Sequence, residues 1–334
     1  MRYDWAVRQT MAVAGARGEG NRVVYGNLSI FSGNANPLLT QAICDHLAVP
    51  LGQAEVKQFS NENIFVRIKQ TVREQDVFVV QSLSSPVNHS IMELLILIDA
   101  LKLASAARIT AVVPYYAYGR TDKKDQPRVP ITGRLLADLI AVAGANRVLT
   151  MDLHAGQIQG FFSIPVDELS ALRFLSDYFL SKQLSDTVVV SPDLGSAKRA
   201  RNFAERIQAP LALIEKRRAE GRLESLNVIG DVRGKRAIIV DDEIDTAGSV
   251  VSTISVLEQQ GATEFYACCT HPILSGPAVQ RLRESKLTEL VATDSVPIPE
   301  HKRLPIMTIL SVAPLFGEAI RRIHTGGSIG QLFR

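Results

Sequence analysis

The chain has 334 residues, about twice the size of a typical domain, so we expect two domains. Apolar residues make up 46% and charged residues 21% of the sequence, as in ordinary globular proteins. A formal net charge of +3 is too small to require a polyanion, so no nucleic-acid partner is expected.

In chain order, residues 1–21 lack a clear period and are expected to form a flexible extension. They carry scattered charges without a compact apolar segment, so we expect no signal peptide and a cytoplasmic protein. The few cysteines, Cys44, Cys268 and Cys269, are expected to be reduced residues of the core.

Beyond this extension, short apolar runs alternate with longer helical patterns. The runs that predict strands are 77–80, 109–113, 148–151, 188–190 and 237–240. Residues 91–101 form the most apolar stretch, but Glu93 and Asp99 interrupt it, which predicts a buried amphipathic helix and no membrane span. The alternation favours an α/β fold with mainly parallel sheets flanked by helices.

Three pairs of segments are similar to each other and follow the same order in the two halves of the chain. The pairs are 32–51 with 191–211, 108–122 with 235–249, and 144–154 with 261–271. Chance similarity is the alternative, because each match alone is weak. A duplicated fold explains all three.

The duplication suggests domain limits. We expect a first domain over residues 22–170, a second over 171–325 and a tail over 326–334.

The apolar run that ends at Val240 is followed by Asp241 and Asp242, and then by the small residues of segment 245–249. A parallel sheet binds ligands at the carboxyl ends of its strands. Backbone N–H groups of segment 245–249, at the start of a helix, predict a phosphate site, and the two acids suit the hydroxyls of a sugar. The alternative is an ordinary helix cap formed by Asp245 or Thr246.

This turn resembles the ribose-phosphate loop of type I phosphoribosyltransferases, and further motifs narrow the match. They are FSNEN (59–63), YGRTD (118–122), MDLHAGQIQGFF (151–162), SPDLGS (191–196), EKRR (215–218) and DDEIDTAGS (241–249). Together they resemble the ribose-phosphate pyrophosphokinase family from about residue 23 to the end of the chain. The resemblance implies two tandem type I phosphoribosyltransferase-like domains.

The resemblance also implies a reaction: Mg²⁺-dependent transfer of the pyrophosphoryl group of ATP to the C1 hydroxyl of ribose 5-phosphate, which releases AMP. Catalysis is then expected from Lys216 and Arg218, on a flexible loop that continues to residue 226. His154 and Asp193 match residues placed near the metal.

The residues that the resemblance assigns to ribose 5-phosphate are Arg218, Asp241, Asp242, Asp245, Thr246, Ala247, Gly248 and Ser249. Those that it assigns to ATP are Phe59, Asn61, Glu62, Asn63, Arg120, Thr121, Asp125 and His154. Two positions depart from the usual family residues: Thr121 replaces a common Gln, and Asn63 replaces a common Glu.

Family members assemble as dimers and commonly as hexamers, with the adenine segment contributed by a neighbouring subunit, so a homo-oligomer is expected. A site for an allosteric phosphate or ADP would correspond to Thr71, Arg73, Arg128 and Ser328. The basic helical segment with Lys198, Arg199, Arg201 and Arg206 is expected to be solvated or to face another subunit.

Two other functions are compatible with parts of the sequence. A nucleobase phosphoribosyltransferase would share segment 241–249 but would not need the first half of the chain. A catalytically weak regulatory homologue would fit the departures at Thr121 and Asn63.

Overall fold

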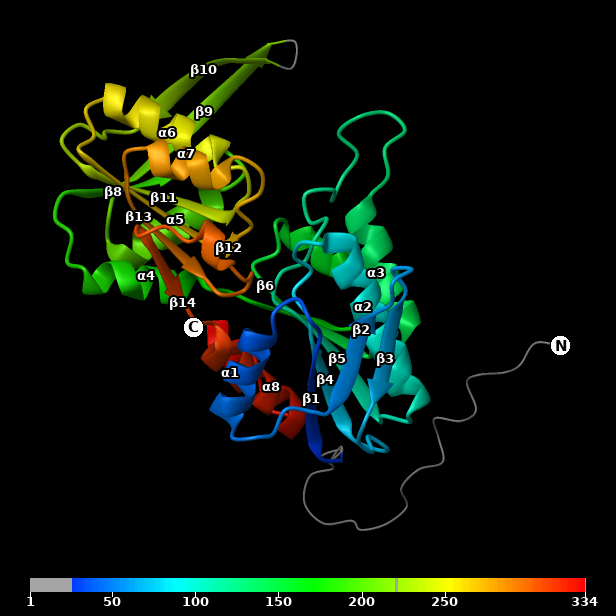
Figure 1. Ribbon diagram of the computed structural model, residues 1–334. Coiled ribbons are helices and arrows are strands. Elements are labelled where there is room, and N and C mark those ends of the chain that lie inside the picture. Colours follow the sequence, from blue (N-terminus) through cyan, green and yellow to red (C-terminus); the bar gives the residue numbers. More distant parts are fainter. Residues whose placement is uncertain (1–25, 220–221, 334) are drawn as a thin grey trace.

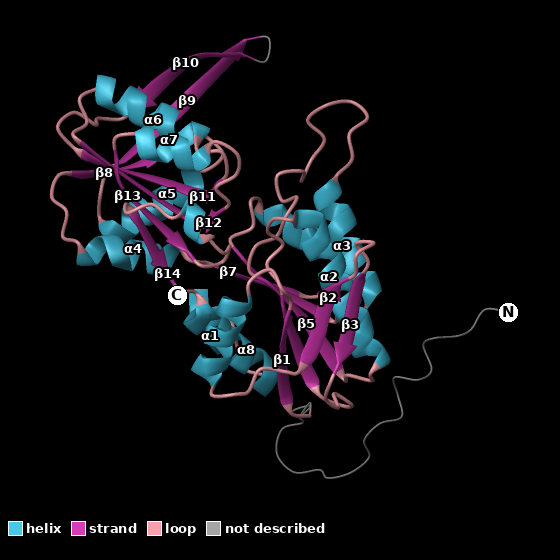
Figure 2. Ribbon diagram, in the orientation of Figure 1, coloured by secondary structure: helices cyan, strands magenta, loops and turns pink. Residues whose placement is uncertain are grey.

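The computed structural model describes residues 26–219 and 222–333. Two lobes, each built on its own sheet, lie side by side (Figure 1). The chain forms most of the first lobe before it enters the second. Figure 2 shows helices on both faces of each sheet, as in the predicted α/β fold. The expected extension, residues 1–21, lies outside the described residues.

The sheet of the first lobe has five parallel strands in the order β1-β4-β5-β6-β7. They are β1 (Leu28–Ser32), β4 (Asp76–Val80), β5 (Arg108–Val113), β6 (Arg147–Met151) and β7 (Val166–Leu169). Every residue of β4 is buried, because helices cover both faces of a parallel sheet. The predicted strands 77–80, 109–113 and 148–151 are therefore confirmed.

Helices α2 (Val87–Leu103) and α3 (Thr132–Ala143) share one apolar core on one face of this sheet. Helix α2 contains the predicted buried stretch. On the other face, α1 (Pro37–Leu47) packs against α8 (Ala313–Thr325), the last α-helix among the described residues. The short antiparallel pair β2 (Ala54–Gln58) and β3 (Ile64–Ile68) forms a separate hairpin.

The sheet of the second lobe has seven strands in the order β10-β9-β8-β11-β12-β13-β14, and β10 alone is antiparallel to its neighbour. They are β8 (Thr187–Ser191), β9 (Leu211–Ala219), β10 (Arg222–Ile229), β11 (Arg236–Ile244), β12 (Glu264–Pro272), β13 (Leu287–Thr293) and β14 (Met307–Leu310). Its helices are α4 (Leu172–Ser181), α5 (Ala197–Ile207), α6 (Gly248–Gln259) and α7 (Ala278–Glu284). The first two pack together, as do the last two.

The strand orders confirm a duplicated fold, but they change which strands of the two lobes correspond. In both lobes the first strand, β1 or β8, is followed by a helix. The chain after that helix pairs in parallel with the same strand, at Leu51 in the first lobe and from Leu211 in the second. The strand on the opposite side is β4 in the first lobe and β11 in the second. The counterpart of β11 is therefore β4, so the predicted matches of 108–122 with 235–249 and of 144–154 with 261–271 are wrong by one strand.

The segment with Lys216 and Arg218 also differs from the expected loop. Strands β9 and β10 pair as an antiparallel hairpin, with Lys216 opposite Leu226 and Arg218 opposite Leu223. The hairpin projects from the second lobe (Figure 1). The side chains of both cations lie outside the part of the chain that can be described.

The lobes are tied together by polar contacts as well as by α8. Asn36 donates from Nδ2 to the carbonyl of Asp294 at 2.8 Å, and Ser82 donates from Oγ to the carbonyl of Ser295 at 2.6 Å. Because α8 packs on the first lobe, the chain crosses between the lobes twice.

All three cysteines are buried and unpaired, as predicted. Among the described residues, no helix is long and apolar enough to cross a membrane.

Candidate active site

A cavity of about 1420 Å³ lies at the carboxyl ends of strands from both lobes. Several predicted residues line it, namely Arg120, His154, Asp193, Asp241, Asp242 and Ser249. The first two belong to the first lobe and the other four to the second. The structure thus brings together residues far apart in the sequence, at the edge where parallel sheets bind ligands.

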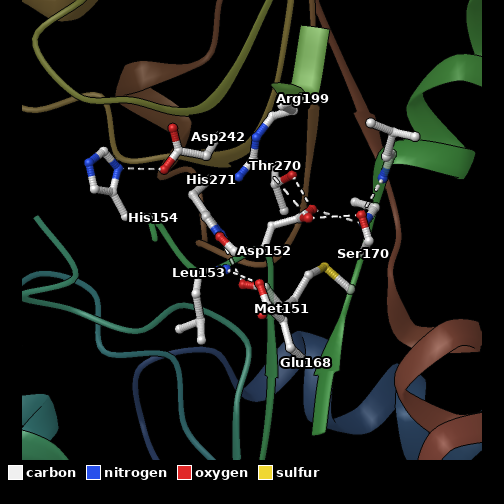
Figure 3. Close-up of polar contacts among 12 residues, drawn as sticks. Met151, Asp152, Leu153, His154, Glu168, Ser170, Arg199, Asp242, Thr270 and His271 are labelled. Carbon is white, nitrogen blue, oxygen red and sulfur yellow. Dashed lines mark hydrogen bonds and ion pairs between the residues drawn. The ribbon is translucent and has the colours of Figure 1, made fainter. Parts of the chain in front are cut away.

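His154 contacts Asp242 across the lobes, with 2.8 Å between Nδ1 and Oδ2 (Figure 3). The hydrogen bond to Asp242 raises the pKa of His154, although partial burial opposes the rise. Burial also works against ionisation of Asp242, but His154 and the charge of Arg199 keep the pKa of that carboxyl below its usual range. The geometry favours a protonated imidazole beside a carboxylate.

Asp241 has a different environment from its neighbour. Its Oδ1 accepts hydrogen bonds from Ser196 Oγ at 2.7 Å and from the backbone N–H of Asp242 at 3.0 Å. Burial, followed by the nearby charge of Asp242, raises the pKa of Asp241. Asp193 begins the adjacent turn, where its Oδ1 accepts the backbone N–H of Ser196 at 3.1 Å. Strand β11 and the turn after β8 thus place three carboxyl groups beside the cavity.

Segment 245–249 contains the turn after β11 and the first two residues of α6. Ala247 is buried and adopts the left-handed conformation, with φ of 59°, immediately before the helix. Among the described residues, no side chain forms a cap hydrogen bond at the N-terminus of α6. The alternative of an Asp245 or Thr246 cap is therefore wrong. Asp245 instead accepts a hydrogen bond from Ser275 Oγ and pairs with Arg120.

Asp152 is the centre of a buried network that joins both lobes (Figure 3). Its carboxylate accepts hydrogen bonds from Ser170 Oγ at 2.9 Å, from the N–H of Ala171 at 2.9 Å and from Thr270 Oγ1 at 2.6 Å. Arg199 lies 3.6 Å away through Nη1. Asp152 has a φ of 38°, in the left-handed region that Asp tolerates better than most residues. These contacts fix the turn that leads to His154.

Two further residues hold the same turn. Glu168 accepts the backbone N–H of Leu153 at 2.8 Å. His271 is buried at the end of β12. Its Nε2 lies 3.2 Å from the carbonyl of Met151, and its Nδ1 lies 2.9 Å from Ser295 Oγ.

Arg199 was not predicted to belong to the site. It lines the cavity from α5, close to four acids, and its side chain is only 21% exposed. The expectation of a solvated or subunit-facing position is therefore wrong for this residue. The other cavity residues that sequence reasoning missed include Asp152, Glu168, Ser196 and Asn202. A sequence signal existed for two of them, because Asp152 lies within the MDLHAGQIQGFF motif and Ser196 within the SPDLGS motif.

Glu243 forms a second link between the lobes. It is buried, with 8% of its surface exposed, and its Oε1 pairs with Nε of Arg120. Its Oε2 accepts a hydrogen bond from the hydroxyl of Tyr115 at 3.3 Å. Arg120 also contacts Asp245, with 3.1 Å between Nη1 and Oδ2. The predicted nucleotide loop and the predicted ribose-phosphate turn are therefore joined directly.

The described residues that the resemblance assigns to the adenine segment do not line the cavity, and neither do Thr121 and Asp125. Phe59, Asn61, Glu62 and Asn63 are exposed at the turn between β2 and β3, where the ring of Phe59 contacts Phe65 and Lys57. Thr121 and Asp125 lie in the segment that follows β5, where Thr121 donates to the carbonyl of Tyr118.

The predicted allosteric residues lie in separate places. Thr71 and Arg73 are exposed after β3, and Arg128 is exposed in the segment before α3. The carbonyl of Ser328 accepts a hydrogen bond from Arg322 after α8. The described contacts do not join the four residues.

Comparisons with known proteins agree with this architecture. Residues 28–144 match the family model for the N-terminal domain of ribose phosphate pyrophosphokinase, and residues 217–334 match the phosphoribosyl synthetase-associated domain. A ribose-phosphate pyrophosphokinase of Caldanaerobacter subterraneus is 56% identical over 92% of this chain and 98% of its own. The corresponding protein of Clostridium acetobutylicum is 52% identical, with the same coverage.

A solved structure has the same fold. The phosphoribosylpyrophosphate synthetase of Mycobacterium smegmatis matches with a TM-score of 0.87 and 44% identity, over 90% of this chain and all of that one. The fold is therefore a tandem pair of type I phosphoribosyltransferase-like domains. The chain belongs to the ribose-phosphate pyrophosphokinase family of enzymes.

Proposed function

We propose that the protein transfers the pyrophosphoryl group of ATP to ribose 5-phosphate. The C1 hydroxyl oxygen forms a bond to the β-phosphorus, the bond from that phosphorus to the oxygen retained by AMP breaks, and the hydroxyl proton is released. The products are 5-phosphoribosyl 1-pyrophosphate and AMP. The observation that supports this reaction best is one cavity lined by Asp241, Asp242 and Ser249 from one lobe and by Arg120 and His154 from the other.

In this proposal, the second lobe binds the acceptor. Asp241 and Asp242 accept hydrogen bonds from the ribose hydroxyls, and the backbone N–H groups of segment 245–249 bind the 5-phosphate. The lack of a side-chain cap on α6 supports this role, because a helix N-terminus attracts an anion through its N–H groups and its dipole.

The nucleotide is then bound from the first lobe and stabilised by the β9–β10 hairpin. Arg120 and His154 face the cavity and would contact the phosphates. Lys216 and Arg218 would stabilise the charge of the transferring group, a compact ammonium and a planar fork respectively. Thr121 and Asp125 belong to the loop that would cover the nucleotide.

Mg²⁺ fits the donor set beside the cavity. Within the described residues, no cluster of three or more His, Cys, Asp or Glu side chains forms a cage. Mg²⁺ usually keeps several waters and takes one or two carboxylates together with substrate phosphates. Asp193 and His154 would hold such an ion beside ATP, and the ion would neutralise charge on the phosphates.

The exposed turn with Phe59, Asn61, Glu62 and Asn63 suits contact with the adenine of a neighbouring subunit, so the proposal includes a dimer-based homo-oligomer, commonly a hexamer. Separation of Thr71 from Ser328 in one chain suits an allosteric site completed by another subunit. A cytoplasmic location is part of the same proposal.

The test is AMP formation by the purified homo-oligomer. We expect AMP only when ATP, Mg²⁺ and ribose 5-phosphate are all present, and none when any one is omitted. Ribosylation of a nucleobase without AMP formation would establish the phosphoribosyltransferase alternative instead.

A matched pair of variants separates an active enzyme from a regulatory homologue. Lys216→Ala is expected to lower kcat by about a hundredfold to a thousandfold, as for loss of one transition-state contact. Lys286→Ala removes an exposed lysine that pairs with Glu258 outside the cavity, and it should leave kcat unchanged. Wild-type turnover no higher than that of Lys216→Ala would favour the regulatory role.

A further inference from the structure

The ion pair between Glu243 and Arg120 is the most buried cation contact between the nucleotide loop and the ribose-phosphate turn. The side chain of Glu243 is 7% exposed, whereas that of Asp245, the other acid on Arg120, is 31% exposed. Low exposure strengthens an ion pair and limits screening by salt. Glu243 is therefore the stronger anchor of the two.

Both carboxylate oxygens of Glu243 have partners from the first lobe. Oε1 contacts Arg120, and Oε2 accepts the hydroxyl hydrogen of Tyr115. Burial raises the pKa of Glu243, and the charge of Arg120 works against this rise. The carboxylate is thus held in one orientation by groups that approach from the lobe opposite to its own.

The two acids leave Arg120 able to bind a ligand. A guanidinium has five N–H donors in a rigid plane, and these contacts use Nε–H and one N–H of Nη1. The side chain of Arg120 remains 51% exposed and lines the cavity. Anchoring Nε fixes the plane, so the remaining donors have a defined direction.

We infer that Glu243 is a positioning residue for nucleotide binding, which acts by holding the Arg120 guanidinium in the orientation that receives a phosphate of ATP. The inference rests on the proposed function, since it assigns a nucleotide phosphate to Arg120. Glu243 itself does not touch the nucleotide. Its contribution is to reduce the loss of side-chain freedom when Arg120 binds.

The experiment measures KM for both substrates in Glu243→Gln, which keeps the size of the side chain and removes its charge. We expect KM for ATP to rise about tenfold, the scale of one charge-assisted hydrogen bond. KM for ribose 5-phosphate and kcat should each change less than about threefold. The split separates positioning of the nucleotide from a general disturbance of the site.

A double-mutant cycle then tests whether Glu243 acts through Arg120. In the Arg120→Ala background, Glu243→Gln should change KM for ATP by less than about twofold, because the group that it positions is gone. Additive effects of the two substitutions would overturn the inference. A lower KM for ATP in Glu243→Gln would also overturn it, because the ion pair would then be withholding Arg120 from the nucleotide.

Glu289→Gln is the matched control. Glu289 is another poorly exposed glutamate with a cation partner, Lys182 at 2.7 Å, but it does not line the cavity. This variant should leave KM for ATP unchanged, whatever its effect on stability. If Glu243→Gln does not fold, Glu243→Asp decides the matter, since a shorter carboxylate must also raise KM for ATP. If wild type itself forms no AMP, the proposed function fails; normal wild-type kinetics with unchanged variants refute the inference alone.

Discussion

Nδ1 of His154 lies 2.8 Å from Oδ2 of Asp242, and this contact joins the end of one sheet to the end of the other. His154 follows β6, while Asp242 lies within β11. Both residues line the cavity. Any change in the angle between the lobes would therefore alter the protonation of the imidazole as well as the shape of the site.

Asp242→Asn should lower the pKa of His154, because the hydrogen bond to the carboxylate is the largest cause of its rise. An NMR titration of the imidazole in the ligand-free protein measures the change. Asp241→Asn is the control, since Asp241 bonds to Ser196 rather than to His154. An unchanged titration in Asp242→Asn would contradict the assigned pair.

Asp152→Ala should lower the free energy of unfolding by about 3–5 kcal/mol, as when one partner of a buried pair is removed. It leaves Thr270, Ala171 and the Arg199 guanidinium without the carboxylate that they contact. Asp167→Ala breaks a more exposed pair with Arg147 and should cost less than about 1 kcal/mol. Urea denaturation compares the two, and equal losses would contradict a central role for Asp152.

His271 should make the protein less stable in acid. Burial lowers its pKa in the folded protein, so the unfolded chain takes up the proton first. The stability that neutral His271 allows is fully present above the unfolded pKa of about 6.5. This stability is lost as the pH falls from there through the lower pKa of His271 in the folded protein. His271→Gln should therefore reduce the slope of unfolding free energy against pH by up to about 1.4 kcal/mol per pH unit. Calorimetry or urea denaturation between about pH 5 and 7, the range in which a histidine titrates, measures that slope.

The same variant needs a check that it remains folded. The glutamine amide can still donate to the carbonyl of Met151, which His271 now contacts through Nε2. A slope identical to that of wild type, in a protein that unfolds cooperatively, would show that His271 is not the group concerned.

The cysteines should be inert in the folded protein. Burial raises the pKa of Cys44 to about 11 and raises those of Cys268 and Cys269 as well, which suppresses the reactive thiolate. A thiol-specific chromogenic disulfide reagent should react with none of them until denaturant is added. Ser181→Cys, at an exposed helix end, provides a reactive thiol for comparison. Rapid labelling of the unmodified native chain would contradict this expectation.

The strands and the class of fold could be predicted because fully buried parallel strands appear as short apolar runs. Their order could not. Strands β4, β5 and β6 have similar apolar sequences, so a match by composition fits β11 to β5 nearly as well as to β4. Hydrogen bonding between neighbours, which determines the order, is not visible in a single strand.

The residues of the site, too, could be predicted only in part. Asp241 and Asp242 were predicted because carboxylates at the end of a parallel strand suit the hydroxyls of a sugar, and His154 was predicted from the resemblance to the family. Arg199 was missed because a basic helical segment usually faces solvent. Its side chain lines a cavity because α5 of the second lobe lies beside Asp152, which follows β6 of the first lobe. Glu243 was missed because its role depends on Arg120, a residue on the other lobe.

Helix α8 has a consequence for synthesis of the chain. Phe316 and Ile320 are buried in the same core as Leu39 and Ile43 of α1, nearly three hundred residues earlier. While the ribosome is still translating the second lobe, this face of the first sheet lacks its last helix and exposes apolar surface. The first lobe is thus completed only after α8 emerges, and a nascent chain that stops before α8 would be a target for chaperones.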